Sequence, residues 1–217
     1  MTTGIFFDLD GTLIDSKQDI AAAVNFARRE SGLPELPLQT VADFTGDGMA
    51  NLVRRSFSGT PFAEDDRVLE LTRNYYSEHE VVYTVLYPGV DAGLKAMAEA
   101  GARLFLVTNK PQEIALGILE KLAVKRYFTS IIGGGGGFAL KPAPDALLGM
   151  AEKYQLNRQW SWILGDHYTD LAAGRRAGVR RALAKWGFGA PRNEYYDAVF
   201  DDFPAFTRAM LYQLKQL

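Results

Sequence analysis

The sequence predicts an α/β fold in which helices cover both faces of a parallel sheet and an all-helical segment is inserted after the first strand. From residue 90 onward, short apolar segments alternate with amphipathic ones, which is typical of strands and helices in such a sheet. An apolar segment at 4–10 supplies the first strand. Between residues 16 and 80 the apolar spacing is helical, and no segment there is typical of a strand.

Size, composition and charge exclude several classes of protein. The chain has 217 residues, 47% of them apolar, which suits one large or two small domains with a substantial core. The formal net charge is −2 and there is no basic block, so we expect no nucleic-acid partner. Cysteine is absent, which excludes disulfides and thiol nucleophiles, and two histidines argue against a histidine-rich metal site.

The distribution of apolar residues also bears on location. No apolar run approaches the ~20 residues that a membrane-spanning helix needs. The first strand begins almost at the N-terminus, which leaves no room for a signal peptide. We therefore expect a soluble, cytoplasmic protein with no membrane partner.

The inserted segment is divided by residues that interrupt helices. Ser16 is suited to cap the first helix, and Gly32 follows its end. Proline and glycine mark breaks at 33–37 and 58–61, and a tight turn is expected at Thr45-Gly46-Asp47-Gly48. The predicted helices cover residues 16–31, 38–44, 49–57 and 63–80.

After the insertion, strands and helices alternate to the end of the chain. Gly101 and Gly178 follow helices, as glycine often does. The five glycines 133–137 predict a mobile loop leading to Lys141, with backbone conformations that other residues resist. The predicted strands cover 4–10, 103–107, 130–132, 160–164, 180–185 and 198–200, and the predicted helices cover 90–100, 112–122, 145–154, 169–177 and 203–214.

Unusual polar residues follow three of these strands. In parallel sheets, functional sites lie beyond the carboxyl ends of the strands, so these residues are expected to meet. Asp8 and Asp10 are two residues apart, so both side chains point the same way and repel each other unless a cation or a proton lies between them. The three polar groups are Asp8 with Asp10, Thr108 with Asn109, and Asp166 with Asp170.

Four motifs occur in a fixed order: Asp8-Leu9-Asp10-Gly11-Thr12, Leu106-Val107-Thr108-Asn109, Lys141-Pro142 and Gly165-Asp166-His167-Tyr168-Thr169-Asp170. In these motifs the chain resembles the haloacid dehalogenase-like hydrolase superfamily. Members with a helical cap carry it between the first and second motifs, where this insertion lies. The chain looks most similar to phosphoglycolate phosphatases, which Thr45-Gly46-Asp47-Gly48 and Leu52-Val53-Arg54-Arg55 support, and more loosely to beta-phosphoglucomutase.

The resemblance implies a Rossmann-like core of residues 1–15 and 85–217 and a helical cap domain of residues 16–84. It implies a magnesium-dependent phosphatase acting on a small phosphorylated metabolite, with phosphoglycolate as the leading substrate. Asp8 would be the nucleophile that forms an aspartyl-phosphate, Asp10 the general acid and base, and Lys141 a positive charge on the phosphoryl group.

The resemblance also assigns binding roles. The Mg²⁺ ligands would be the Asp8 side chain, the Asp10 backbone carbonyl and Asp166, with Asp170 binding directly, through water, or by way of Lys141. The phosphoryl oxygens would be bound by Thr108 and the Asn109 N–H, and the substrate by Gly46, Asp47 and Gly48, unless that loop is a mere turn. His167 is interpreted as a non-catalytic spacer. Arg54 and Arg55 are interpreted as a solvated helix face, with contact between one of them and a substrate carboxylate as the alternative.

Alternatives remain open at this point. The same core motifs serve a sugar phosphomutase or a pyrophosphatase, and a protein that binds phosphorylated metabolites without turnover could keep the fold. The sequence is compatible with a monomer or a homodimer.

Overall fold

A six-stranded parallel sheet forms the centre of the computed structural model, which describes residues 2–216. The strands lie in the order β5-β4-β1-β6-β7-β8. β1 is therefore flanked by β4 and β6, and the carboxyl ends of all three strands meet at one edge. The strands are β1 Gly4–Phe7, β4 Arg103–Pro111, β5 Phe128–Gly134, β6 Trp162–Gly165, β7 Arg180–Ala184 and β8 Ala198–Phe200.

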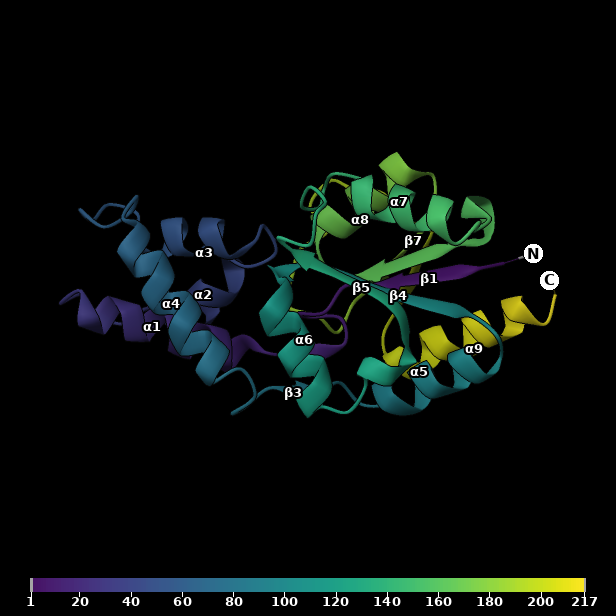
Figure 1. Ribbon diagram of the computed structural model, residues 1–217, viewed down its shortest axis with the longest axis horizontal. Helices are drawn as coiled ribbons and strands as arrows, with labels where there is room; N and C mark the ends of the chain where they lie inside the picture. Colours follow the sequence, from purple (N-terminus) through teal and green to yellow (C-terminus); the bar gives the residue numbers. More distant parts are fainter. Residues whose placement is uncertain (1, 217) are drawn as a thin grey trace.

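Helices cover both faces of the sheet, which confirms the predicted fold class. Figure 1 shows α7 and α8 on one face and α5, α6 and α9 on the other. Because side chains alternate along a strand, Phe6 packs into the core beneath α7 and α8, whereas Phe7 packs into the opposite core. The helices are α5 Val90–Glu99, α6 Gln112–Lys121, α7 Asp145–Lys153, α8 Tyr168–Ala177 and α9 Phe203–Leu214.

The inserted helices lie beside the sheet rather than on it (Figure 1). Residues 16–84, all of which are described, contain helices and no strand, as the sequence predicts. The division into domains at residues 16 and 84 stays a prediction. The helical insertion consists of α1 Lys17–Glu30, α2 Leu38–Asp43, α3 Met49–Ser56 and α4 Asp66–Glu78.

Two short strands join the insertion to the core. β2 Ile14–Asp15 and β3 Val85–Leu86 pair in antiparallel fashion where the chain leaves the core and returns to it. Asp19, at the start of α1, accepts hydrogen bonds from the backbone N–H groups of residues 82, 83 and 84. Strands of this length carry no periodic signal, so the sequence did not reveal them.

Several predicted boundaries were wrong, and two of these bear on the site. The first strand ends at Phe7, so Asp8 begins the following loop, while β4 continues to Pro111 rather than ending at residue 107. α4 begins only at Asp66, because the Asp65 side chain caps it through the N–H of Arg67. Short 3₁₀ turns at Lys125–Tyr127 and Arg158–Trp160 were not predicted.

The five glycines are not wholly a loop. Gly133 and Gly134 belong to β5, and a Cβ at Gly133 would lie 2.5 Å from the Cα of Gln112. Gly135 and Gly137 have φ angles of +84° and +88°, the left-handed conformation that other residues resist. The mobility expected of this segment stays a prediction.

Candidate active site

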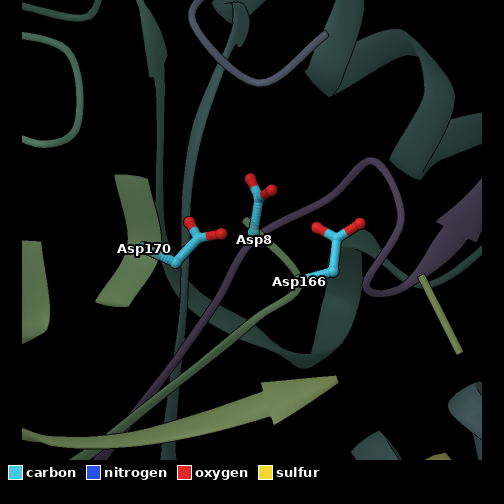
Figure 2. A group of neighbouring side chains, drawn as sticks. All are labelled: Asp8, Asp166 and Asp170. Carbon is cyan, nitrogen blue, oxygen red and sulfur yellow. The ribbon is translucent and has the colours of Figure 1, made fainter. Parts of the chain in front are cut away.

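Three carboxylates converge at the carboxyl edge of the sheet. Asp8 follows β1, Asp166 follows the adjacent strand β6, and Asp170 lies in the first turn of α8. All three are buried, and an oxygen from each lies within 4.8 Å of an oxygen from the other two. Figure 2 shows the three carboxylates turned toward a common space. Such a set of oxygen ligands is suited to a hard divalent cation.

Lys141 lies on one side of this cluster. Its Nζ is 2.8 Å from Asp8 Oδ1, 2.6 Å from Asp170 Oδ1 and 2.6 Å from the carbonyl oxygen of Val107. The side chain is buried, so these contacts replace its hydration. The ion pair with Asp170 is the contact by way of Lys141 that the resemblance implied, whereas direct or water-mediated metal binding by Asp170 stays a prediction.

Asn109 holds the backbone of Lys141 in place. Its side-chain Oδ1 accepts the N–H of Lys141 at 2.8 Å, and its Nδ2 donates to the Lys141 carbonyl oxygen at 2.8 Å. Nδ2 also donates to the carbonyl oxygen of Gly46 in the helical insertion, at 2.9 Å. The sequence predicted a role for the Asn109 backbone N–H, which stays a prediction, but not this role for its side chain.

The charges of the cluster are only partly balanced by the chain. Burial, together with the charges of Asp8 and Asp170, raises the pKa of Asp166 well above its ordinary value. Burial likewise raises the pKa of Asp170 to about 7 against the influence of Lys141. Burial alone would lower the pKa of Lys141, but its ion pairs with Asp170 and Asp8 raise it. Asp166 has no ion pair among the described residues, so its charge is the least compensated of the three.

Asp10 belongs to a second polar group, beside the first. Its Oδ1 accepts the hydroxyl of Ser16 at 2.5 Å and lies 3.0 Å from Lys110 Nζ. Ser16 was expected to cap α1 through its side chain, but no such bond forms because the hydroxyl is directed to Asp10. Lys110 Nζ also donates to the hydroxyl of Tyr76 at 2.5 Å. This group therefore joins the sheet edge to α4 of the insertion.

The two polar groups meet at a cavity of about 50 Å³ between the sheet edge and the helical insertion. Asp8 and Asp10 line it together with Thr108 and Lys110 from β4. The opposite wall is largely apolar. It is formed by residues of the insertion, among them Ile20, Gly46, Gly48, Met49, Leu52 and Tyr76.

The Asp47 side chain binds the loop at residues 45–48 both to the core and to α3. The Asp47 carboxylate accepts the hydroxyl of Tyr168 at 2.6 Å and forms an ion pair with Arg55. Asp47 is absent from the residues that line the cavity, whereas Gly46 and Gly48 line it. A Cβ at Gly46, whose φ is +97°, would meet the His167 ring at 2.5 Å, so the loop approaches the core closely.

His167 and the arginines of α3 do not line the cavity. His167 is buried, its Nδ1 lies 3.0 Å from Thr169 Oγ1, and burial lowers its pKa to about 4. Its backbone N–H donates to Asp170 Oδ2 at 3.1 Å. Arg54 is exposed and bonded to Asn51, as expected of a solvated face, whereas Arg55 is engaged with Asp47.

Lys110 is the main feature of the site that the sequence did not reveal. The prediction ended the strand at residue 107 and assigned Lys110 no role. β4 continues to Pro111, and the consecutive residues Thr108, Asn109, Lys110 and Pro111 all line the cavity. The position of Lys110 directly after the Thr108-Asn109 motif is the signal by which it could have been found.

A parallel sheet with three buried acids and a buried lysine at its carboxyl edge is typical of an α/β enzyme with its site beyond the strand ends. A model of the haloacid dehalogenase-like hydrolases matches residues 5–184. The chain belongs to this family of hydrolases.

Named relatives and a solved structure agree with this assignment. The chain is 38% identical over 184 residues to a phosphoglycolate phosphatase of Aquifex aeolicus, with 85% of each chain covered. It is 34% identical over 196 residues to a phosphoglycolate phosphatase of Nitrosospira multiformis, covering 88% of this chain and 86% of that one. The crystal structure of a predicted phosphoglycolate phosphatase from Haemophilus somnus superposes with a TM-score of 0.91 at 27% identity, covering 96% of this chain and 97% of that one.

The comparisons establish the family and the fold, not the task of each residue. The catalytic, metal-binding and substrate-binding assignments made from the sequence therefore stay predictions. They concern Asp8, Asp10, Lys141, Thr108, Asn109, Gly46, Asp47, Gly48, Asp166 and Asp170. No helix in the described part of the chain is both long enough and apolar enough to cross a membrane.

Proposed function

We propose that this protein is a magnesium-dependent phosphatase that hydrolyses phosphoglycolate through an aspartyl-phosphate on Asp8. One observation carries the proposal. The carboxylates of Asp8 and Asp10 line the same cavity, yet each is held by a different lysine, Asp8 by Lys141 and Asp10 by Lys110. Two carboxylates in separate settings can perform separate tasks at one phosphorus atom.

In the first half of the reaction, an Asp8 carboxylate oxygen attacks phosphorus and the bond from phosphorus to the ester oxygen breaks. Asp10 gives its proton to that departing oxygen, so the leaving group departs as an alcohol. The Lys141 ammonium, 2.8 Å from Asp8 Oδ1, orients the nucleophile and offsets the charge that the phosphoryl group brings. Thr108 follows Val107 at the cavity edge, where its hydroxyl can donate to a phosphoryl oxygen.

In the second half, Asp10 takes a proton from a water molecule, and the water oxygen attacks the phosphorus of the aspartyl-phosphate. The acyl-phosphate bond breaks, inorganic phosphate leaves and the Asp8 carboxylate is restored. Ser16 and Lys110 fix the orientation of Asp10 throughout, because both contact its Oδ1. The same residue therefore gives and then regains one proton.

The acidic cluster fits a divalent cation. Its three carboxylates share a single buried ammonium. Burial and the charges of Asp8 and Asp170 raise the pKa of Asp166, and no ion pair among the described residues offsets its charge. Asp8 and Asp166 would hold Mg²⁺ with the Asp10 backbone carbonyl, and Asp170 would support them through Lys141. When bound, the cation offsets the repulsion between Asp8 and the phosphoryl oxygens.

The helical insertion acts as a cap in this proposal. It closes one side of the cavity with apolar residues, which exclude bulk water from the phosphoryl group. The chain would bend near residues 14–16 and 82–88, where β2 pairs with β3. Phosphoglycolate is the proposed substrate because the relatives named above are phosphoglycolate phosphatases.

The test is phosphate release from a panel of phosphorylated metabolites with Mg²⁺, measured for the wild type and for Asp8→Asn. We expect the wild type to prefer phosphoglycolate and Asp8→Asn to lose at least about 1,000-fold in kcat. Acid quenching with a ³²P-labelled substrate should trap label on the wild-type protein and none on the variant. Asp66→Asn, an exposed aspartate of α4, is the matched control.

The outcomes separate the alternatives. A mutase would transfer phosphate to a second hydroxyl and depend on a sugar bisphosphate, and a pyrophosphatase would prefer inorganic pyrophosphate. A binding protein would release phosphate from none of the panel. Full activity in Asp8→Asn would refute the mechanism itself.

A further inference from the structure

We propose that Lys110 is a substrate-binding residue that recognises the carboxylate of the leaving group and so selects carboxylated phosphomonoesters. The inference rests on the proposed function and names the residue that gives it its specificity. No motif considered in the sequence assigned Lys110 a role. Its burial, its partners and its place in the cavity support this role.

Lys110 is a buried cation with few partners. Its side chain is 3% exposed, and its ammonium contacts Asp10 Oδ1 at 3.0 Å and the Tyr76 hydroxyl at 2.5 Å. A lysine ammonium has three N–H donors, and these contacts use two of them. Burying an ammonium is costly unless its donors are satisfied, so a third acceptor would be strongly favoured here. The cavity is the space from which such an acceptor can come.

Charge within the cavity also indicates a task for Lys110. Among the described residues that line it, Lys110 is the only cation, facing the carboxylates of Asp8 and Asp10. A phosphomonoester with a carboxylate adds still more negative charge. Lys141 is already paired with Asp8 and Asp170 at the phosphoryl side, so it cannot also serve the far end of the substrate.

The arginines of α3 do not compete for this role. Arg55 is paired with Asp47 and donates to the carbonyl oxygen of Phe44, and Arg54 is exposed and bonded to Asn51. Neither lines the cavity. The cation nearest to the leaving group is therefore the one on β4.

The position of Lys110 relative to Asp10 matches the chemistry of a two-carbon leaving group. Asp10 protonates the ester oxygen in the proposed mechanism, so that oxygen must lie within hydrogen-bond reach of its carboxylate. In phosphoglycolate, one methylene carbon separates the ester oxygen from the carboxylate carbon. A carboxylate so close to the ester oxygen falls beside Lys110 Nζ, which is itself in contact with Asp10.

Tyr76 links this recognition to the helical insertion. Its ring lies 4.3 Å from Lys110 Nζ and its hydroxyl accepts from the same atom, although Tyr76 belongs to α4 and Lys110 to the sheet. The ammonium is therefore held for the substrate only when α4 lies against the core. The ring face and hydroxyl of Tyr76 stabilise the ammonium beside its ion pair with Asp10, and its third N–H remains for a substrate anion.

The experiment compares phosphoglycolate with ethyl phosphate, which has the same two carbons and no carboxylate. For the wild type, Lys110→Met and Lys110→Gln, kcat and KM are measured on both substrates with saturating Mg²⁺. We expect both variants to lower the ratio of kcat/KM for phosphoglycolate over ethyl phosphate by about 10- to 100-fold, the value of a hydrogen bond to a charged group. The loss should lie mainly in KM.

Controls and outcomes keep the inference distinct from the proposed function. Lys125→Met removes a surface lysine, 46% exposed, and should leave the ratio unchanged. If both substrates lose equally through kcat, Lys110 merely positions Asp10 and the inference is refuted while the phosphatase stands. An unchanged ratio in both variants refutes it in the same way. A wild type that hydrolyses ethyl phosphate at least as well as phosphoglycolate overturns the inference and the assigned substrate together.

Discussion

The side-chain amide of Asn109 pairs with the backbone of Lys141 at both of its polar atoms, accepting the N–H and donating to the carbonyl oxygen at 2.8 Å each. This pairing fixes the residue whose ammonium contacts Asp8 and Asp170. The second motif of the chain thus positions the third. Replacement of Asn109 tests whether this positioning matters for the reaction.

We expect Asn109→Ala to lower kcat by about 10-fold or more, because a displaced ammonium no longer offsets charge in the transition state. Two buried backbone groups also lose partners, which should cost about 2–4 kcal/mol of unfolding free energy. Steady-state kinetics and urea unfolding measure the two effects. Asn74→Ala, an exposed asparagine of α4, should change neither, and an Asn109→Ala enzyme with normal kcat would contradict the positioning role.

Removal of the metal should leave the charge of Asp166 uncompensated and so destabilise the folded protein. Burial and two neighbouring carboxylates raise the pKa of Asp166, so without a cation its charge destabilises the folded state at neutral and higher pH. In EDTA at pH 8, Asp166→Asn should therefore raise Tm by about 2–4 °C or more, since each kcal/mol shifts Tm by roughly this amount in a chain of this size. With Mg²⁺, the wild type should gain stability and the variant should not.

Thermal unfolding with and without Mg²⁺ measures both parts of that prediction, and EDTA should abolish wild-type hydrolysis. Asp201→Asn, at an exposed aspartate, serves as the control because its ion pair with Lys185 is on the surface. A variant that is stabilised by Mg²⁺ as strongly as the wild type would show that Asp166 is not a ligand.

The sequence predicted the fold class and the residues that meet at the sheet edge because both depend on local patterns. The alternation of strand and helix specifies a parallel sheet, and such a sheet brings the ends of β1, β4 and β6 together. Asp8, Asp10, Thr108 and Asp166 could be placed together by that argument alone.

What the sequence did not reveal depends on contacts between distant residues. The bond from Ser16 to Asp10 replaces an expected helix cap, and a capping residue looks the same in sequence whichever partner it takes. The contact of Lys110 with Tyr76 joins residues 34 positions apart on different elements. For Asn109, the sequence predicted a role only for the backbone N–H. The pairing of its side-chain amide with Lys141 is a tertiary contact, which leaves no periodic pattern in the sequence.

The bond between Asp47 and Tyr168 tests the predicted role of the loop at residues 45–48. Tyr168→Phe removes the hydroxyl that Asp47 accepts at 2.6 Å and leaves Arg55 in place. Because Gly46 and Gly48 line the cavity, a loosened loop should raise KM by about 3- to 10-fold with little change in kcat. Tyr212→Phe, at a tyrosine that is 70% exposed, should alter neither constant. An unchanged KM in Tyr168→Phe would show that this bond does not order the binding loop.

His167 should make the protein sensitive to mild acid. Burial lowers its pKa in the folded state to about 4, so between its ordinary value near 6.5 and that value the unfolded chain binds a proton that the folded chain does not. The contribution of this histidine is therefore full above pH 6.5 and is lost as pH falls toward 4. From pH 7 to pH 5, the loss amounts to about 2 kcal/mol of unfolding free energy.

The measurement is urea unfolding in EDTA at pH 7 and pH 5, for the wild type and for His167→Gln. The nearby carboxylates titrate in both proteins, so the difference between the two isolates the histidine. We expect the wild type to lose about 2 kcal/mol more than His167→Gln on acidification. His79→Gln, at an exposed histidine stacked on Tyr75, should follow the wild type. Equal acid sensitivity in the wild type and His167→Gln would mean that His167 accepts its proton in the folded state, with its ring reaching solvent.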